Sequence, residues 1–420
     1  MTEYLFRFCP LQPWFFGGER GFRYGPDAVD DSGNLNYFVK SNLIPQQTTL
    51  LGAVKYILLK SQGIKVRTDW RYPDEEWEKI SSIAGYGVIN AEEEGDSRFF
   101  GAVEEISPLL LNRDDVYWLP VPADHLEEGE TKYMRAKYKP MPYVCLDNKK
   151  AWGNFGSVGF LKGYSAEKGL FSGWMNVWTG ETWRNDEIFV ECTRVGIEIP
   201  EQLKKVTGQQ EEKKFYKQTY ISFRKQNPEV DQGACPEVAY DHNHRQDKGG
   251  LPDRFALFVK LKDGIKIDCK GGFANFEVML GGRGGLFAVE VTEEKDLCYR
   301  EIEQEYYTRV LEASGQPRIV LISDTLVSYE VLNHLAEYAV YETVDFRPFS
   351  VDISQAQSRA KTGKAVKSLG DRSSVAYRLL KRGAVIYPKE GVSGKELDNC
   401  VMQRLGYNRK IVIGGERGYA

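Results

Sequence analysis

A run of four glycines around one arginine, Gly281-Gly282-Arg283-Gly284-Gly285, constrains the fold of this chain more than any other motif. Apolar and β-prone residues occupy positions 276–280 before it and 286–291 after it, so the pattern predicts two strands joined by a turn. A Rossmann fingerprint would need a helix after the glycines, and a P-loop would need a lysine followed by serine or threonine. The run is therefore either a flexible hairpin turn or a loop whose exposed N–H groups bind an anion beside Arg283.

Strand and helix patterns alternate along the rest of the chain, which predicts an α+β fold. The first strand covers residues 4–8, and the paired glycines Gly17 and Gly18 break the strand pattern. Apolar residues from Leu50 to Leu58 then recur at helical spacing, with Thr48 or Thr49 as the expected N-cap and Gly63 as the end. Further strands are expected at residues 116–119, 188–190, 215–223, 255–261, 319–322 and 384–387, and residues 375–382 are helical or strand-like.

Two segments read as loops, and one short motif occurs twice. Residues 152–164 alternate glycines with aromatic residues, which indicates turns held by ring packing, and the polar residues 227–252 indicate a long loop. The hexapeptide Gly-Gly-Glu-Arg-Gly-Phe at 17–22 returns as Gly-Gly-Glu-Arg-Gly-Tyr at 414–419. The two copies are either related or independent tight turns, since glycine turns draw on few residue types.

The charge of the chain is uneven. Its formal net charge is −4, which argues against nucleic-acid binding along its whole length. Residues 355–382, however, carry eight basic residues and one acid, or +7, and residues 131–150 carry six and one, or +5. Tyr133, Tyr138 and Tyr143 lie within the second patch. Each patch is either a solvated face or a phosphate-binding surface, with the tyrosines suited to base stacking.

Metal and membrane sites find little support in the sequence. The four histidines are scattered, and the pair His242 and His244 lies in a polar loop without the third and fourth ligands that a metal site needs. The seven cysteines are widely spaced with no C-x-x-C pair, which favours a reducing cytoplasm. No apolar run approaches a membrane helix, and the first residues do not form a signal peptide. We therefore expect no metal, no cofactor and no membrane contact.

Several stretches carry a family resemblance. Residues 10–20 (PLQPWFFGGER), 40–53 (KSNLIPQQTTLLGA), 193–197 (TRVGI) and 406–408 (GYN) resemble the third-subunit family of the Cmr-type (type III-B) CRISPR effector complex. The glycine run around Arg283 is similar to loops of the wider RAMP superfamily.

The resemblance implies an α+β fold of two ferredoxin-like (RRM-type) domains with long inserted loops, at residues 1–200 and 201–420. It implies a non-catalytic, cytoplasmic subunit in antiviral defence that holds the 5′ tag of the crRNA and caps the complex. Its partners would be the crRNA, the large polymerase-like subunit, the backbone subunits and, indirectly, the target RNA. Together with the basic patches, the resemblance makes these residues the candidate RNA contacts: Arg20, Arg23, Lys40, Ser41, Gln46, Thr48, Thr49, Gly281, Gly282, Arg283, Gly284, Gly285, Arg372 and Lys381.

Two other functions stay open. A repeat-RNA endoribonuclease of the same superfamily would need a general base beside the glycine run, such as His125, His242, His244 or a Tyr or Lys substitute. A glycan-binding or glycan-cleaving protein is the alternative from another class, motivated by the Trp, Tyr and Gly content of residues 152–183. Salt separates these classes, because RNA binding weakens steeply with ionic strength.

Overall fold

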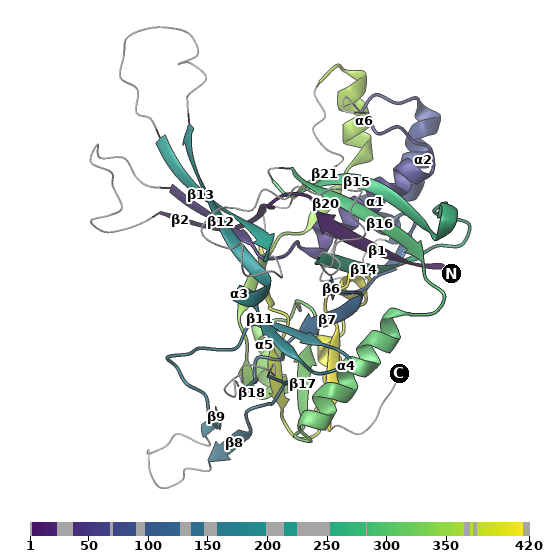
Figure 1. Cartoon of the computed structure of the whole chain (residues 1–420). Helices are drawn as coiled ribbons and strands as arrows, with labels where there is room; N and C mark the ends of the chain where they lie inside the picture. Colours follow the sequence, from purple (N-terminus) through teal and green to yellow (C-terminus); the bar gives the residue numbers. More distant parts are fainter. Residues whose placement is uncertain are drawn as a thin grey trace.

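The computed structural model describes residues 2–22, 37–67, 70–89, 97–126, 136–146, 158–198, 214–224, 253–282, 284–364, 370–372 and 376–414. Helices and mostly antiparallel sheets alternate along the chain, as the α+β prediction expected (Figure 1). No helix among these residues is long and apolar enough to cross a membrane.

A nine-stranded antiparallel sheet forms the centre of the molecule. Its order is β11-β10-β7-β6-β14-β1-β16-β15, and β5 pairs with the other end of β14. The strands are β1 (Thr2–Pro10), β5 (Val103–Ile106), β6 (Leu110–Arg113), β7 (Val116–Pro120), β10 (Gly173–Asn176), β11 (Thr182–Arg184), β14 (Arg254–Leu261), β15 (Phe273–Leu280) and β16 (Gly285–Glu293). This sheet takes strands from both sides of residue 200. The division into domains at residues 1–200 and 201–420 stays a prediction.

Both faces of the central strand β1 are buried. Tyr4, Phe6 and Phe8 face one core, and Leu5 faces the other, as the period of two in a strand requires. The first core contains α1 (Gln47–Ser61) and α2 (Asp74–Ala84), and the second contains α4 (Tyr299–Ala313). A strand covered on both sides is apolar at nearly every position, and in residues 4–8 only Arg7 interrupts the apolar sequence.

A second, four-stranded sheet lies against α4 through that second core. It has the order β18-β23-β17-β24, and every neighbouring pair is antiparallel. In chain order its elements are β17 (Arg318–Leu321), α5 (Tyr329–Leu335), β18 (Ala336–Val340), β23 (Val385–Pro388), the turn η5 (Lys395–Leu397), α7 (Cys400–Arg404) and β24 (Lys410–Ile413). A segment at residues 341–384, with elements of its own, is inserted between β18 and β23. Strand and helix therefore alternate as β-α-β-β-α-β, with the first and third strands adjacent in the middle.

A third sheet, also four-stranded, extends away from the large one (Figure 1). Its order is β12-β13-β3-β2, in which β13 runs parallel to β3 and the other pairs are antiparallel. The strands are β2 (Phe16–Phe22), β3 (Tyr37–Asn42), β12 (Phe189–Glu198) and β13 (Lys214–Phe223), and the short helix α3 (Asn185–Ile188) leads into β12. We refer to β12-β13-β3-β2 as the projecting sheet.

Smaller elements complete the fold. A three-stranded sheet joins β4, β20 and β21, while β19 pairs with β22 and β8 pairs with β9. Their bounds, with those of the remaining helix and turns, are β4 (Gly87–Val88), β8 (Tyr143–Leu146), β9 (Val158–Leu161), β19 (Thr343–Phe346), β20 (Phe349–Val351), β21 (Gly370–Arg372), β22 (Tyr377–Leu380), α6 (Ile353–Lys361), η1 (Ser97–Phe100) and η4 (Lys270–Gly272).

Most of the predicted strands are confirmed, and residues 377–380 form a strand rather than a helix. Two local predictions are wrong. The helix predicted from Thr48 or Thr49 begins at Gln47, and its N-cap is Gln46. Residues 16–22 form a strand rather than a break, because the register of β2 shifts between Gly17 and Arg20 and Gly18 fits against β3. A Cβ on Gly18 would lie 2.4 Å from the Lys40 carbonyl oxygen, so only glycine packs there.

The two loop segments and the repeat are tested only in part. Residues 158–161 of the glycine–aromatic segment form the strand β9 rather than turns. Residues 152–157 of that segment lie outside the described residues. The predicted loop at 227–252 lies outside them too, as does the second hexapeptide after Gly414. Its relation to the first copy stays open.

Candidate nucleic-acid interface

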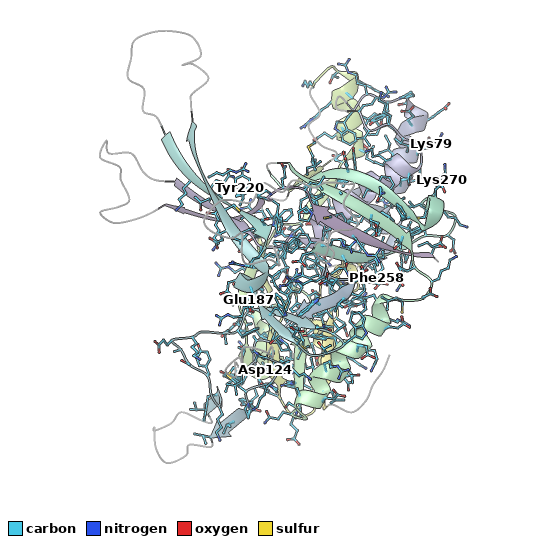
Figure 2. The ribbon with its side chains drawn as sticks, viewed as in Figure 1. Lys79, Asp124, Glu187, Tyr220, Phe258 and Lys270 are labelled. Atoms are coloured by element: carbon cyan, nitrogen blue, oxygen red, sulfur yellow. The ribbon has the colours of Figure 1, made fainter. Side chains whose placement is uncertain are left out.

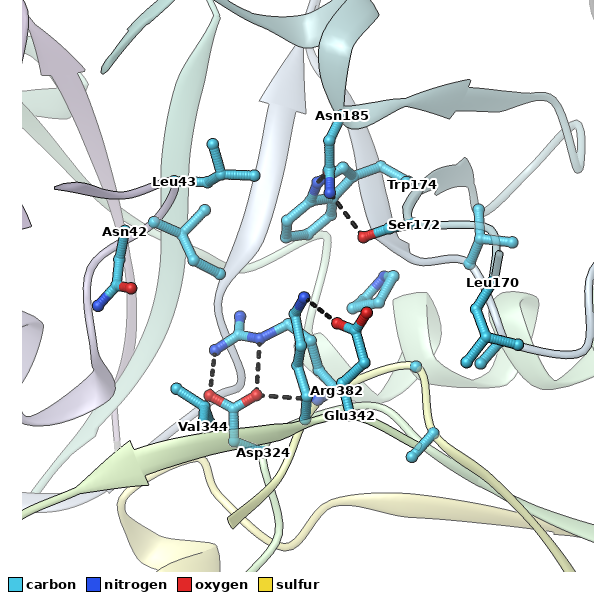
Figure 3. Close-up of a pocket in the computed structure, with 18 of the residues that line it drawn as sticks. Asn42, Leu43, Leu170, Ser172, Trp174, Asn185, Asp324, Glu342, Val344 and Arg382 are labelled. Atoms are coloured by element: carbon cyan, nitrogen blue, oxygen red, sulfur yellow. Dashed lines mark hydrogen bonds and ion pairs between the residues drawn. The ribbon is translucent and has the colours of Figure 1, made fainter. Parts of the chain in front are cut away.

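A cleft of about 340 Å³ opens at the base of the projecting sheet (Figure 3). Three walls form it. The first is residues 40–46, which lead from β3 into α1; the second is residues 170–174 with Asn185 and Phe189; and the third comes from the segments around Asp324, Glu342 and residues 381–384. The cleft therefore joins the projecting sheet, the edge of the nine-stranded sheet and the loops of the C-terminal sheet.

Hydrogen bonds within the chain hold the first wall in place. The Ser41 hydroxyl is buried, accepts from the Phe16 N–H at 2.8 Å and donates to the Asn42 carbonyl at 2.8 Å. The indole N–H of Trp14 donates to the Leu43 carbonyl at 3.0 Å. The Gln46 amide donates to the Asp345 carbonyl at 2.9 Å, which ties this wall to the third. The side chain of Ser41 thus supports the wall from behind.

The start of α1 is anchored but not capped by a side chain. Gln46 has extended backbone, and no capping hydrogen bond from a described side chain is present. The neighbouring Gln47 is fully buried and donates to the carbonyls of Ser107 and Gly406 at 2.8 and 3.2 Å. Thr48 and Thr49 follow in the first turn, half-buried. Part of this N-terminus is already satisfied within the chain, because the Thr49 N–H donates to the Gln46 carbonyl at 2.9 Å and the Tyr407 hydroxyl lies against Thr48.

The cations of the cleft are paired with carboxylates. Lys40 Nζ lies 2.5 Å from a Glu191 oxygen, and Lys381 Nζ lies 2.6 Å from a Glu342 oxygen, with all four side chains 40–55% exposed. Arg382 is held more firmly. Its Nε and Nη2 donate to the two Asp324 oxygens at 3.1 and 3.0 Å, and its backbone N–H donates to the same carboxylate (Figure 3).

The second wall is aromatic with a polar edge. Trp174 is buried, and its indole N–H donates to the Asn185 side-chain oxygen at 3.1 Å. The Asn185 amide in turn donates to the Ser172 hydroxyl at 2.7 Å (Figure 3). Phe171 lies beside them in the lining. Because Trp174 is buried, this wall offers a ligand the half-buried Phe171 ring with the exposed Ser172 hydroxyl beside it.

The projecting sheet continues the interface away from the cleft. β3 reaches the cleft through Lys40, and β12 reaches it through Phe189. On the sheet, the Arg194 guanidinium lies 4.9 Å from the ring centre of Tyr220, and that ring lies 5.6 Å from the Phe15 ring. Figure 2 labels Tyr220 on this sheet, well away from Lys79 and Lys270.

The predicted site residues fall into several groups. Lys40, Ser41, Gln46 and Lys381 line the cleft, although Lys381 is far from the others in sequence, whereas Thr48 and Thr49 do not line it. The backbone of Arg20 pairs with Val39 on β3, and that of Arg372 pairs with Phe349 on β20, whereas Arg23 and Arg283 lie outside the described residues.

The glycine run is a hairpin turn between β15 and β16. Gly281 and Gly284 have φ of +80° and +66°, and the Gly284 N–H donates to the Gly281 carbonyl at 3.2 Å. A Cβ on Gly281 would lie 2.2 Å from the Phe15 carbonyl oxygen. Gly282 and Gly285 complete the turn. The turn does not line the cleft, but it packs on Phe15, next to the Phe16 N–H that Ser41 binds.

Two expectations about the basic patches need correction. Tyr138, expected to stack on bases, is buried and donates its hydroxyl to Asp124 at 2.8 Å, so it belongs to the core. The +7 count of residues 355–382 overstates the local charge, because at least four of those cations pair with carboxylates from other segments. The pairs are Lys361–Asp74, Arg378–Asp345, Lys381–Glu342 and Arg382–Asp324.

Sequence reasoning did not single out Trp174, Asn185, Asp324 or Arg382. The aromatic content of residues 152–183 and the basic run ending at Arg382 were the available signals. Among the described residues, no group of three or more His, Cys, Asp and Glu side chains is placed to hold a metal. His125 is buried against Phe171 and Tyr138, and His242 and His244 lie outside the described residues.

A known protein family matches most of the chain. The family model described as "CRISPR-associated protein (Cas_Cmr3)" matches residues 6–374 of the chain. The match takes in the first two walls of the cleft and the projecting sheet, and it ends before residues 381–384 of the third wall. No curated protein matches the chain.

Proposed function

Because the chain belongs to the Cas_Cmr3 family of CRISPR-associated proteins, and is therefore a subunit of a Cmr-type (type III-B) complex, we propose that it is a non-catalytic subunit that binds the 5′ tag of the crRNA. One observation carries the proposal: the cleft gathers Lys40, Gln46 and Lys381, which come from opposite ends of the chain. An RNA strand in the cleft would meet cations, backbone N–H groups and an aromatic wall together.

The start of α1 supports a phosphate at the first wall. The helix has fifteen residues, and its positive end has no side-chain cap from the described residues. The positive end of this helix and the half-buried Thr49 hydroxyl are of the kind that favour a phosphate. The ion pairs of Lys40 and Lys381 are half-exposed, so a phosphate can replace the carboxylate partner at small cost.

Aromatic surfaces support a single-stranded ligand. The half-buried Phe171 ring lies in the second wall of the cleft, and Arg194 stacks over Tyr220 on the projecting sheet. Bases of single-stranded RNA stack on aromatic and guanidinium planes. We propose that the tag runs from the cleft along the projecting sheet, with Arg20 and the turn at 281–285 near its path.

The C-terminal sheet supports the ferredoxin-like part of the proposal. Its elements β17-α5-β18-β23-α7-β24 and their order β18-β23-β17-β24 are those of a ferredoxin-like unit. In the nine-stranded sheet, β1 lies beside β16, the second strand of the hairpin β15–β16, and α1 follows β1 in the chain. The other neighbour of β1 is β14, which precedes that hairpin in the chain. The strand order around β1 therefore differs from that of a simple ferredoxin-like unit.

The proposed place of this subunit is at one end of a cytoplasmic complex. There it would cap the assembly, contact the large polymerase-like subunit and the backbone subunits, and meet target RNA only indirectly. Membership of a multi-subunit complex follows from the family, and the individual contacts are our proposal.

A charge-reversal experiment tests RNA binding. We expect Lys40→Glu with Lys381→Glu to weaken binding of single-stranded RNA carrying the 5′ tag by roughly tenfold or more. If each lysine contacts one phosphate, the slope of log K against log salt falls by about 1.4. Lys79→Glu with Lys270→Glu is the matched control, because both lysines lie far from the cleft (Figure 2). Equal affinity of the two double variants would remove the cleft from the RNA path.

A further inference from the structure

The two-stranded ribbon β8–β9 has two chemically different faces. Val144 lies opposite Phe160, and Leu146 lies opposite Val158. Residues opposite each other in an antiparallel pair point to the same side, and neighbours along a strand point to opposite sides. These four side chains therefore share one face, while Tyr143, Cys145, Gly159 and Leu161 share the other.

The second face is anchored to the body of the protein. The Tyr143 ring stacks on the rings of Tyr387 and Tyr338, at centroid distances of 4.6 and 5.3 Å. The Tyr143 N–H and carbonyl both bond the Gln316 side-chain amide, at 3.0 and 3.1 Å. A Cβ on Gly159 would lie 2.7 Å from the Tyr143 ring, so the glycine lets this ring lie flat across the ribbon. An isolated two-stranded hairpin is marginal in water, and these contacts hold this one in position.

The first face is apolar and open to solvent. Leu146, Val158 and Phe160 are 48%, 47% and 39% exposed, and Val144 is half-buried. All eight residues of the two strands lack a charged side chain. Figure 1 shows the ribbon at the lower left, away from the large sheet. Contiguous exposed apolar residues on a strand pair normally mark a surface that another protein covers.

The chemistry and the size of this face limit which kind of molecule can bind it. RNA is disfavoured, because the face offers neither a cation nor a hydrogen-bond donor to phosphate. A second copy is disfavoured as well, because a stable dimer buries about 800 Å² per partner and four side chains expose only a few hundred. A small apolar face is sufficient where other contacts hold the same two proteins together.

We propose that the Val144–Leu146–Val158–Phe160 face docks into an apolar, uncharged groove on a neighbouring protein subunit of the complex. This inference rests on the proposed function for the existence of that neighbour. The ribbon acts as a preformed contact, since its base is fixed before the partner arrives and little conformational entropy is lost on docking.

The test uses the full chain co-expressed with the remaining subunits and the guide RNA. Val158→Lys with Phe160→Lys places two charges on the face, and Leu146→Lys tests it from the other strand. Met279→Lys is the control, since Met279 is 75% exposed on β15, in a different part of the molecule. We expect the ribbon variants to lose at least tenfold of one neighbouring subunit in native mass spectrometry, while the isolated chains keep the wild-type Tm and RNA affinity.

Three results would overturn the proposal. The first is an unchanged subunit composition in the ribbon variants. The second is loss of RNA binding by the isolated variant chain at unchanged Tm, which would make the face an RNA contact. The third is a wild-type dimer that the substitutions dissociate, which would make the occupant a second copy. Failure of the proposed function would give a different result, because the wild-type chain itself would then bind no tag RNA.

Discussion

The cleft and the centre of the C-terminal sheet both contain arginine or lysine paired with a carboxylate, but in opposite environments. At the centre, Arg318 and Asp124 are fully buried, with Nη1 2.6 Å from Oδ2. The hydroxyls of Tyr138 and Tyr387 donate to the same carboxylate at 2.8 and 3.1 Å. At the cleft, Lys40 and Lys381 pair with carboxylates in half-exposed positions.

The difference separates a structural role from a binding role. A fully buried pair whose carboxylate is bonded by its own chain is closed to a phosphate, and breaking it leaves a buried charge. A half-exposed pair contributes little to stability and can exchange its partner. Arg382 and Asp324 lie between these extremes, since they line the cleft but are only 6% and 10% exposed.

The largest effect should come from opening the sealed pair. Asp124→Ala leaves Arg318 without its counter-charge and the two tyrosine hydroxyls without their acceptor, so we expect a loss of about 3–5 kcal/mol in the free energy of unfolding. Asp345→Ala is the control, because its pair with Arg378 is about 80% exposed at 3.9 Å. Urea denaturation followed by tryptophan fluorescence measures both, and equal costs would erase the distinction.

The intermediate pair should give an intermediate cost. Arg382→Met removes both charged hydrogen bonds to Asp324 and leaves that carboxylate nearly buried. We expect a loss of about 2 kcal/mol in the free energy of unfolding together with weaker RNA binding. Lys381→Met, one residue earlier, should change stability by less than about 0.5 kcal/mol. If the Arg382 variant were as stable as the Lys381 variant, the Arg382–Asp324 pair would belong with the half-exposed pairs.

A second buried cationic side chain, Lys55, should make the stability of the fold depend on pH. It is buried, its Nζ lies 2.5 Å from the Phe99 carbonyl oxygen, and burial lowers the pKa of Lys55 to about 7. Between pH 7 and the ordinary lysine pKa of 10.5, the unfolded chain holds this proton and the folded chain releases it. The free energy of unfolding should therefore rise with pH from 7 upward, by at most about 1.4 kcal/mol per pH unit. Relative to Lys55→Met, a flat difference between pH 7 and 9 would show that Lys55 keeps its charge.

The smallest stability effect is expected at the open pairs. Lys40→Gln and Lys381→Gln should each change the free energy of unfolding by less than about 0.5 kcal/mol, since both pairs are exposed to screening. Their affinity for tag RNA should nevertheless fall, uniformly across sequences, as expected for phosphate contacts. Thermal melts and RNA titrations on the same samples check both halves of this prediction, and a large stability loss would place these lysines with the sealed group.

Sequence patterns predicted the fold best where both faces of a strand are buried. For that reason the strands at residues 4–8 and 255–261 are apolar except at Arg7 and Lys260. The sequence patterns failed at Gly17 and Gly18. A strand that packs closely on the Lys40 backbone needs glycine there, and glycine is also the residue that marks a turn. The N-cap of α1 was missed because Gln46 bonds Asp345, and no local rule reports a contact so distant in sequence.

The residues of the cleft could likewise be predicted from the sequence only in part. The family resemblance and the basic run proposed Lys40, Gln46 and Lys381, but only the fold brings them together. Counting charges along residues 355–382 overstated the patch, because the neutralising carboxylates Asp74, Asp324, Glu342 and Asp345 come from other segments. Trp174 and Asn185 carry no motif, and their role depends on which strand ends meet at the cleft.

The central claim is that the 5′ tag of the crRNA lies in the cleft and along the projecting sheet. The most direct test is to assemble the complex on a crRNA with 4-thiouridine in its tag, irradiate it, and map the crosslinked peptides of this subunit by mass spectrometry. We predict crosslinks within residues 40–49 and 170–174 and at Tyr220. Tag crosslinks confined to other subunits, or to a distant face of this one such as α4, would contradict the account.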